Sequence, residues 1–115
     1  MEQIRALAQK LGAAMARHER FELFRAARTA FRADDDAQAL QRDYDAAAEV
    51  LQRKTVLNQP LEPEEKRAEM ELRETVAQNA VLMELLRRQA DFHELMREVN
   101  AKIDEALGMS DDAGA

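Results

Sequence analysis

The feature that most constrains this chain is a repeat, apolar at every position except Gln89, that keeps its spacing throughout the last third of the chain. Its members recur at alternating steps of three and four residues: Leu82, Leu85, Gln89, Phe92, Met96, Val99, Ile103 and Ala106. Such a repeat is typical of a helix in extended contact with another long helix. About 29 helical residues rise about 43 Å. We therefore expect a long partner for this helix, either residues 34–58 or a second chain.

The rest of the chain also predicts helices. With 3 glycines and 2 prolines in 115 residues, it has too little turn chemistry for many short strands. Apolar residues follow helical spacing in four further segments: 2–16, 18–33, 34–58 and 63–78. Asp34 and Asn79 are suited to cap helices, and Gly108 is suited to end one. No strong capping residue stands near His18, so residues 1–33 form either one helix or two.

These patterns predict an all-α fold of four or five helices. Two of the helices, residues 34–58 and the final helix, are long and antiparallel in a bundle or coiled-coil-like arrangement that self-associates. In this prediction residues 1–107 form a single helical domain. Residues 108–115 are small and polar, and we expect them to form a disordered tail.

Composition excludes several classes of function. The chain has no cysteine, which rules out disulfides, a thiolate nucleophile and cysteine-ligated metals. We find no catalytic or metal-binding motif, and we predict a protein that is not an enzyme and holds no metal or cofactor. His93 and Met96, at a spacing of three, leave a haem carrier as one alternative. No apolar run approaches a membrane span and no signal peptide is evident, so we expect a cytoplasmic protein.

The long apolar seam supplies the candidate oligomer interface. We assign to it five residues: Gln89, Phe92, Met96, Val99 and Ile103. The polar Gln89 either fixes the register of paired helices or lies at the rim and reaches water. Charge supports association of copies, because residues 1–33 carry a net charge of +4 and the remainder carries −10.

A stripe of arginines supplies the candidate partner-binding site. Arg25, Arg28 and Arg32 fall on one side of the second helical segment, flanking Phe24 and Phe31. Such a stripe grips an acidic protein surface or RNA phosphates, or is simply a solvated face. An RNA-binding module is therefore the alternative function, although the net charge of −6 disfavours general binding to phosphate backbones.

Two segments resemble a known bacterial family. Residues 18–44 have an acidic-aromatic entry, an alanine-bearing helix, and Asp and Ala ahead of a Leu and an aromatic residue. Residues 79–107 open with Asn and continue with a Leu-rich turn, a Leu-Met pair and a terminal Ile. Both segments resemble the YlbF/YmcA family of small helical regulators. His18 replaces the family's frequent Ser, and Ala80 replaces a frequent Pro.

The resemblance implies an all-α, usually self-associating protein without enzyme activity. It also implies partners: the chain itself, other small helical regulators, or an RNA-processing enzyme. Better-studied relatives act in a complex that adjusts a membrane-anchored endoribonuclease, and through it mRNA processing, competence, sporulation and biofilm formation. Some relatives ligate iron–sulfur clusters through cysteines, a role that does not transfer to a chain without cysteine.

Overall fold

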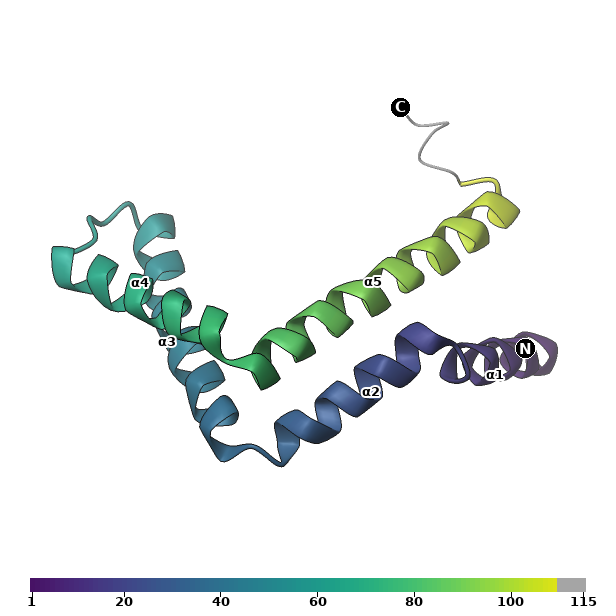
Figure 1. Cartoon of the computed structure of the whole chain (residues 1–115). Coiled ribbons are helices and arrows are strands. Elements are labelled where there is room, and N and C mark those ends of the chain that lie inside the picture. The colour runs from purple at the N-terminus through teal and green to yellow at the C-terminus, as the bar shows by residue number, and fades with distance from the viewer. Residues whose placement is uncertain (110–115) are drawn as a thin grey trace. The chain divides into compact units, whose positions relative to one another are not determined.

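The computed structural model describes residues 1–109, which form helices joined by short connections (Figure 1). The helices are α1 (Glu2–Ala16), α2 (Glu19–Arg32), α3 (Asp35–Val56), α4 (Pro63–Gln78) and α5 (Ala80–Leu107). No strand occurs among the described residues, so the all-α prediction is confirmed, with five helices rather than four. The predicted tail lies, from residue 110 on, outside the described residues.

Local hydrogen bonds explain where α3 and α5 begin. Asp34 Oδ1 accepts a hydrogen bond from the Ala37 backbone N–H at 2.9 Å, and Asn79 Oδ1 accepts one from the Leu82 N–H at 2.9 Å. Both are N-cap contacts, which satisfy backbone donors that lack a partner inside the helix. α4 begins at Pro63, where the missing N–H is not needed.

A histidine separates α1 from α2. His18 Nδ1 accepts a hydrogen bond from the Arg20 backbone N–H at 3.1 Å, and the His18 carbonyl accepts bonds from the N–H groups of Phe21 and Glu22. His18 therefore occupies the N-cap position of α2, where a side-chain acceptor normally bonds the second or third helical N–H. This cap is the reason that residues 1–33 form two helices.

Residues with positive φ end α3 and α5. Asn58 (φ 57°) follows the first and Gly108 (φ 74°) follows the second. After each, the next N–H donates to a carbonyl five positions earlier, at 2.8 Å in both cases. This Schellman geometry satisfies carbonyls at the helix end.

The chain divides into two compact units. The α3–α4 unit comprises Ala27–Leu86, and the α1–α5 unit comprises Met1–Ala26 together with the chain from Arg87. The expected pairing of residues 34–58 with the final helix concerns both units and stays a prediction. The single domain over residues 1–107 also stays a prediction.

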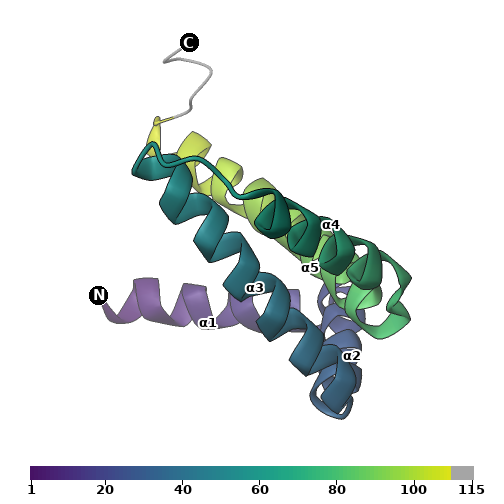
Figure 2. The same ribbon diagram turned by 90° about the vertical axis from the view of Figure 1, so that its left-hand side faces the viewer.

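The α3–α4 unit contains every buried residue of the described chain. Its two long helices pack side by side as a hairpin (Figure 2). The buried residues are Ala27, Ala37, Glu69, Val76 and Leu82. Since two of them are alanines and one is a carboxylate, the apolar area removed from water is small.

Ion pairs add to this small core. Lys54 donates a hydrogen bond from Nζ to Glu65 Oε1 across the hairpin, and the Glu62 backbone N–H donates to the same oxygen at 2.9 Å. These bonds, with that from Lys54 the stronger, hold the pKa of the Glu65 carboxyl below its usual range. Arg73 donates to the buried Glu69 carboxylate, and this contact raises the pKa of the Arg73 guanidinium.

The α1–α5 unit has a different character. None of its described residues is buried. Within residues 1–109 no helix combines the length and the apolar character needed to cross a membrane.

Candidate protein-interaction surface

The predicted interface residue Phe92 lies against α2 of its own chain. Its ring centroid is 5.3 Å from that of Phe21, with the planes tilted by 57°, and 5.4 Å from that of Phe24, on which it stacks. Centroid separations in this range are favourable for aromatic pairs. Phe92 therefore helps to hold α5 to α2 within one copy.

The remaining seam residues become more exposed toward the C-terminal end of α5. Gln89, Met96 and Val99 are half-buried, whereas Ile103 is 45% exposed. Leu107, which is 65% exposed, continues the apolar stripe beyond the predicted set. Of the five predicted residues, Val99 and Ile103 lie where a second protein has access. Their role in an interface stays a prediction.

An open apolar groove of about 600 Å³ lies at this end of α5. Its lining residues are Leu11, Leu95, Glu98, Val99, Lys102, Ile103 and Ala106. Leu11 comes from α1, and α5 supplies the others. The arrangement is an apolar floor with one acidic and one basic side chain at its edge, which suits the apolar face of a helix.

The apolar face of α1 extends this surface. Ile4 is 64% exposed, Leu7 is 57% exposed, and none of the residues of α1 is buried. Both views show the N-terminal half of α1 running clear of α2 and α5 (Figures 1 and 2). An amphipathic helix normally packs its apolar stripe against the rest of the protein. The predicted interface contained no residue of α1, although the helical spacing of its large apolar residues was a signal that could have included it.

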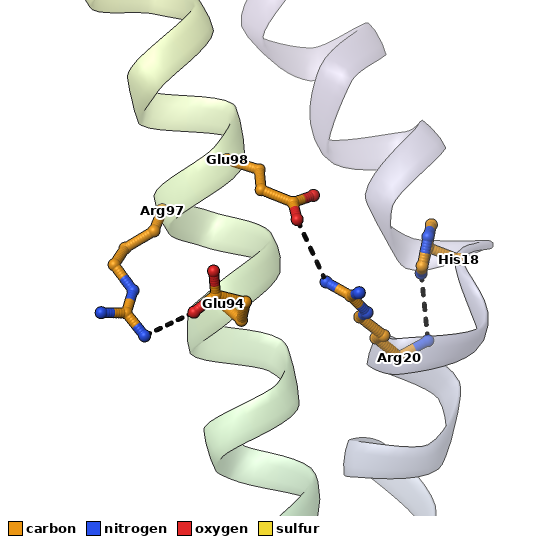
Figure 3. Close-up of polar contacts among 5 residues, drawn as sticks. All are labelled: His18, Arg20, Glu94, Arg97 and Glu98. Atoms are coloured by element: carbon orange, nitrogen blue, oxygen red, sulfur yellow. Dashed lines mark hydrogen bonds and ion pairs between the residues drawn. The ribbon is translucent and has the colours of Figure 1, made fainter.

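One ion pair beside the groove joins α2 to α5 (Figure 3). Arg20 Nη1 lies 3.8 Å from Glu98 Oε1, which is an ion-pair distance but too long for a hydrogen bond. Glu94 pairs instead with Arg97 on its own helix. The Glu98 side chain is largely exposed and the Arg20 side chain is partly exposed, so the pair adds little stability. It does place a carboxylate at the edge of the groove.

The arginine stripe is only partly available to a partner. The Arg25 guanidinium carbon lies 5.1 Å from the centroid of the Phe21 ring, and Nη2 donates to the Ala16 carbonyl at 3.4 Å. These contacts fix Arg25 at the junction of α1 and α2. Arg28 is half-buried, and Arg32 is exposed in the last turn of α2.

The described residues form no metal centre. Within residues 1–109, no group of three or more His, Cys, Asp or Glu side chains is placed to hold an ion. Of the pair considered for haem, His93 is exposed and Met96 is half-buried on α5. The apolar groove and the exposed apolar face of α1 remain the candidate binding surfaces of this unit.

Together, the fold and this surface define a class: a small all-α protein with exposed apolar helical faces. The chain matches the family model described as control of competence regulator ComK, YlbF/YmcA, over residues 4–108. It therefore belongs to the YlbF/YmcA family, as the two sequence segments indicated, and is a member of a regulatory family.

A solved structure shares the fold. It is the X-ray crystal structure of Bacillus subtilis RicA in complex with RicF, which matches with a TM-score of 0.73 and 18% sequence identity. The match covers 92% of this chain and 94% of the other. At this identity the likeness concerns the fold alone. No curated protein matches the chain.

Proposed function

We propose that this protein is a non-catalytic regulatory subunit that acts by binding other helical proteins. The observation that carries the proposal is the exposed apolar surface formed by α1 and the end of α5, in a unit that has no buried residue within residues 1–26 and 87–109. Patches of this kind on small proteins mark interaction sites. The regulatory family and the fold shared with RicA, which was crystallised with RicF, support the same role.

The proposal extends to a process. We place the protein as an accessory factor in a cytoplasmic complex that modulates RNA processing by a membrane-anchored endoribonuclease, which is the role that family resemblance implies. Its partners in this proposal are further copies of itself, other small helical regulators and the enzyme. The groove on α5 and the face of α1 are the surfaces through which it binds them.

Capture from native cells tests this function. The full chain, tagged and cross-linked in the organism that produces it, is expected to enrich another YlbF/YmcA protein or an endoribonuclease. Leu7→Asp, which places a charge on the apolar face of α1, is expected to lose them. Gln9→Asp introduces the same charge on the opposite face and is expected to retain them. Recovery of neither class of protein by the unmodified chain contradicts the proposal.

The alternative of an RNA-binding module has less support. The net charge is −6, and Arg25 is engaged by Phe21 and Ala16. We therefore expect no gel shift of single-stranded RNA at physiological salt. A shift that weakens steeply with added salt, and is reduced by Arg32→Gln, favours the alternative instead.

A further inference from the structure

We propose that the tip of the α3–α4 hairpin is a latch, which the Lys54–Glu65 ion pair holds closed and which opens while the base of the hairpin stays packed. The hairpin tip comprises residues 47–68, which are the end of α3, the connection and the first turns of α4. This latch belongs to the α3–α4 unit and is independent of the proposed function, which rests on surfaces of the α1–α5 unit.

The buried residues of the α3–α4 unit all lie outside the hairpin tip. Ala37 is in the first turn of α3, Val76 is in the last turn of α4, and Leu82 is in the first turn of α5. From residue 38 to residue 68 no side chain is buried. Burial of apolar area is the main favourable term in helix packing, so the base of the hairpin has it and the tip lacks it.

A cavity weakens the packing of the tip further. It has a volume of about 180 Å³, and residues from both helices line it: Ala47, Val50, Leu51, Glu65 and Ala68. Side chains that face a void lose the dispersion contacts that a filled space would provide. Apolar packing therefore holds α3 and α4 together only loosely at this end.

The Lys54–Glu65 pair supplies the polar contact that joins the two helices at the tip. Within residues 47–68 no other ion pair connects α3 to α4. Its side chains are 24% and 29% exposed, whereas those of the Arg53–Glu49 pair within α3 are 60% and 73% exposed. An ion pair that is shielded from water is stronger than an exposed one, so Lys54 and Glu65 are suited to hold the tip closed.

Both helices keep their own end contacts when this pair separates. Glu65 Oε1 also accepts a hydrogen bond from the Glu62 backbone N–H at 2.9 Å, which belongs to the capping box of α4. The Gln59 N–H donates to the Lys54 carbonyl at 2.8 Å, which closes the end of α3. Since neither contact requires the other helix, the tip can open without unwinding α3 or α4.

Opening the latch changes the apolar surface of the hairpin. Val56 and Leu57 are already 75% and 56% exposed at the end of α3. Val50 and Leu51, on the preceding turns, are half-buried against the cavity. Separation of α4 from α3 uncovers them and joins the four side chains into one exposed apolar surface. The Lys54–Glu65 pair thereby controls how much apolar surface this unit presents.

Native-state hydrogen exchange of the full-length protein tests the latch. The amides of residues 50–56 report on the tip, and those of residues 73–78 report on the base. In low concentrations of urea, we expect the exchange of the tip amides to depend little on urea and that of the base amides to depend on it steeply. The reason is that urea dependence scales with the surface exposed by opening, which is small for the tip and large for the whole unit.

Three substitutions distinguish the latch from simple fraying at the end of α3. Lys54→Met removes the ion pair, and we expect the protection of the tip amides to fall roughly fivefold. Arg53→Met removes the pair with Glu49 inside α3 and is the matched control, expected to leave this protection unchanged. Val76→Ala weakens the base and should lower the protection of the base amides while sparing the tip, because the open state keeps the base packed.

Two results from the variants overturn the latch. One is a protection of the tip amides that falls no further in Lys54→Met than in Arg53→Met. The other is an equal loss of protection at the tip and the base in Val76→Ala. Should Val76→Ala fail to fold, the wild-type chain decides, because the same urea dependence for tip and base amides shows that the tip opens only when the whole unit unfolds.

Discussion

His18 decides, at the residue scale, that the N-terminal segment is two helices. Its Nδ1 is the side-chain acceptor for the Arg20 N–H. Because Asp is a far stronger N-cap residue and also favours the positive end of the helix dipole, we expect His18→Asp to raise the free energy of unfolding by roughly 0.5–1 kcal/mol. Urea denaturation at fixed chain concentration measures the change. His93→Ala, on exposed α5 surface, should stay near neutral, and a less stable His18→Asp contradicts the assigned cap.

Phe92 is the residue that we expect to matter most for the contact between α2 and α5. Its ring meets both Phe21 and Phe24, but the side chain is only half-buried. We expect Phe92→Ala to destabilise the protein by about 2 kcal/mol, below the ~3–5 kcal/mol found for fully buried rings. Leu86→Ala, at an exposed position of the same helix, provides the comparison. Equal effects of the two substitutions are inconsistent with the aromatic contact.

At the scale of elements, the α3–α4 hairpin is expected to weaken in acid. The pKa of Glu65 is lowered in the folded state, chiefly by its hydrogen bond with Lys54. A lowered folded pKa contributes stability that is present above the unfolded value, about 4.3, and is lost as the pH falls through the folded value. Glu65→Gln removes this contribution. Urea titrations from pH 6 downward should show a smaller loss in the variant, and identical pH profiles contradict the assignment.

Most helix boundaries could be predicted from the sequence because they depend on contacts between residues that are close in the chain. Asp34 and Asn79 cap helices through atoms three residues away, and Gly108 ends α5 through its own backbone. His18 was ambiguous because histidine is a rare cap. The partners of Phe92 were not predictable, since a heptad repeat identifies an apolar face but not the helix that covers it. The same limit applies to α1: the sequence shows that one face of this helix is apolar, but it does not show that the face is left exposed in the folded chain.

For the whole molecule, the two units differ in how many of their described residues are buried, and this difference bears on stability. The α3–α4 unit has a small core, and the α1–α5 unit has no buried residue among those described. If a second copy completes the α1–α5 unit, the folded state is coupled to association by mass action. We therefore expect the Tm of the wild-type chain to rise with protein concentration and that of Leu7→Asp to be lower and independent of it. A concentration-independent Tm for both chains contradicts this coupling.

The molar mass in solution tests the central claim, that the apolar faces of α1 and α5 bind a further copy of the chain. Light scattering of the purified full-length protein at micromolar concentration is predicted to give twice the 13.1 kDa mass of one chain. Leu7→Asp is predicted to give one chain mass, and Gln9→Asp is predicted to match the wild type. A wild-type protein that remains at 13.1 kDa across the accessible concentration range contradicts the account.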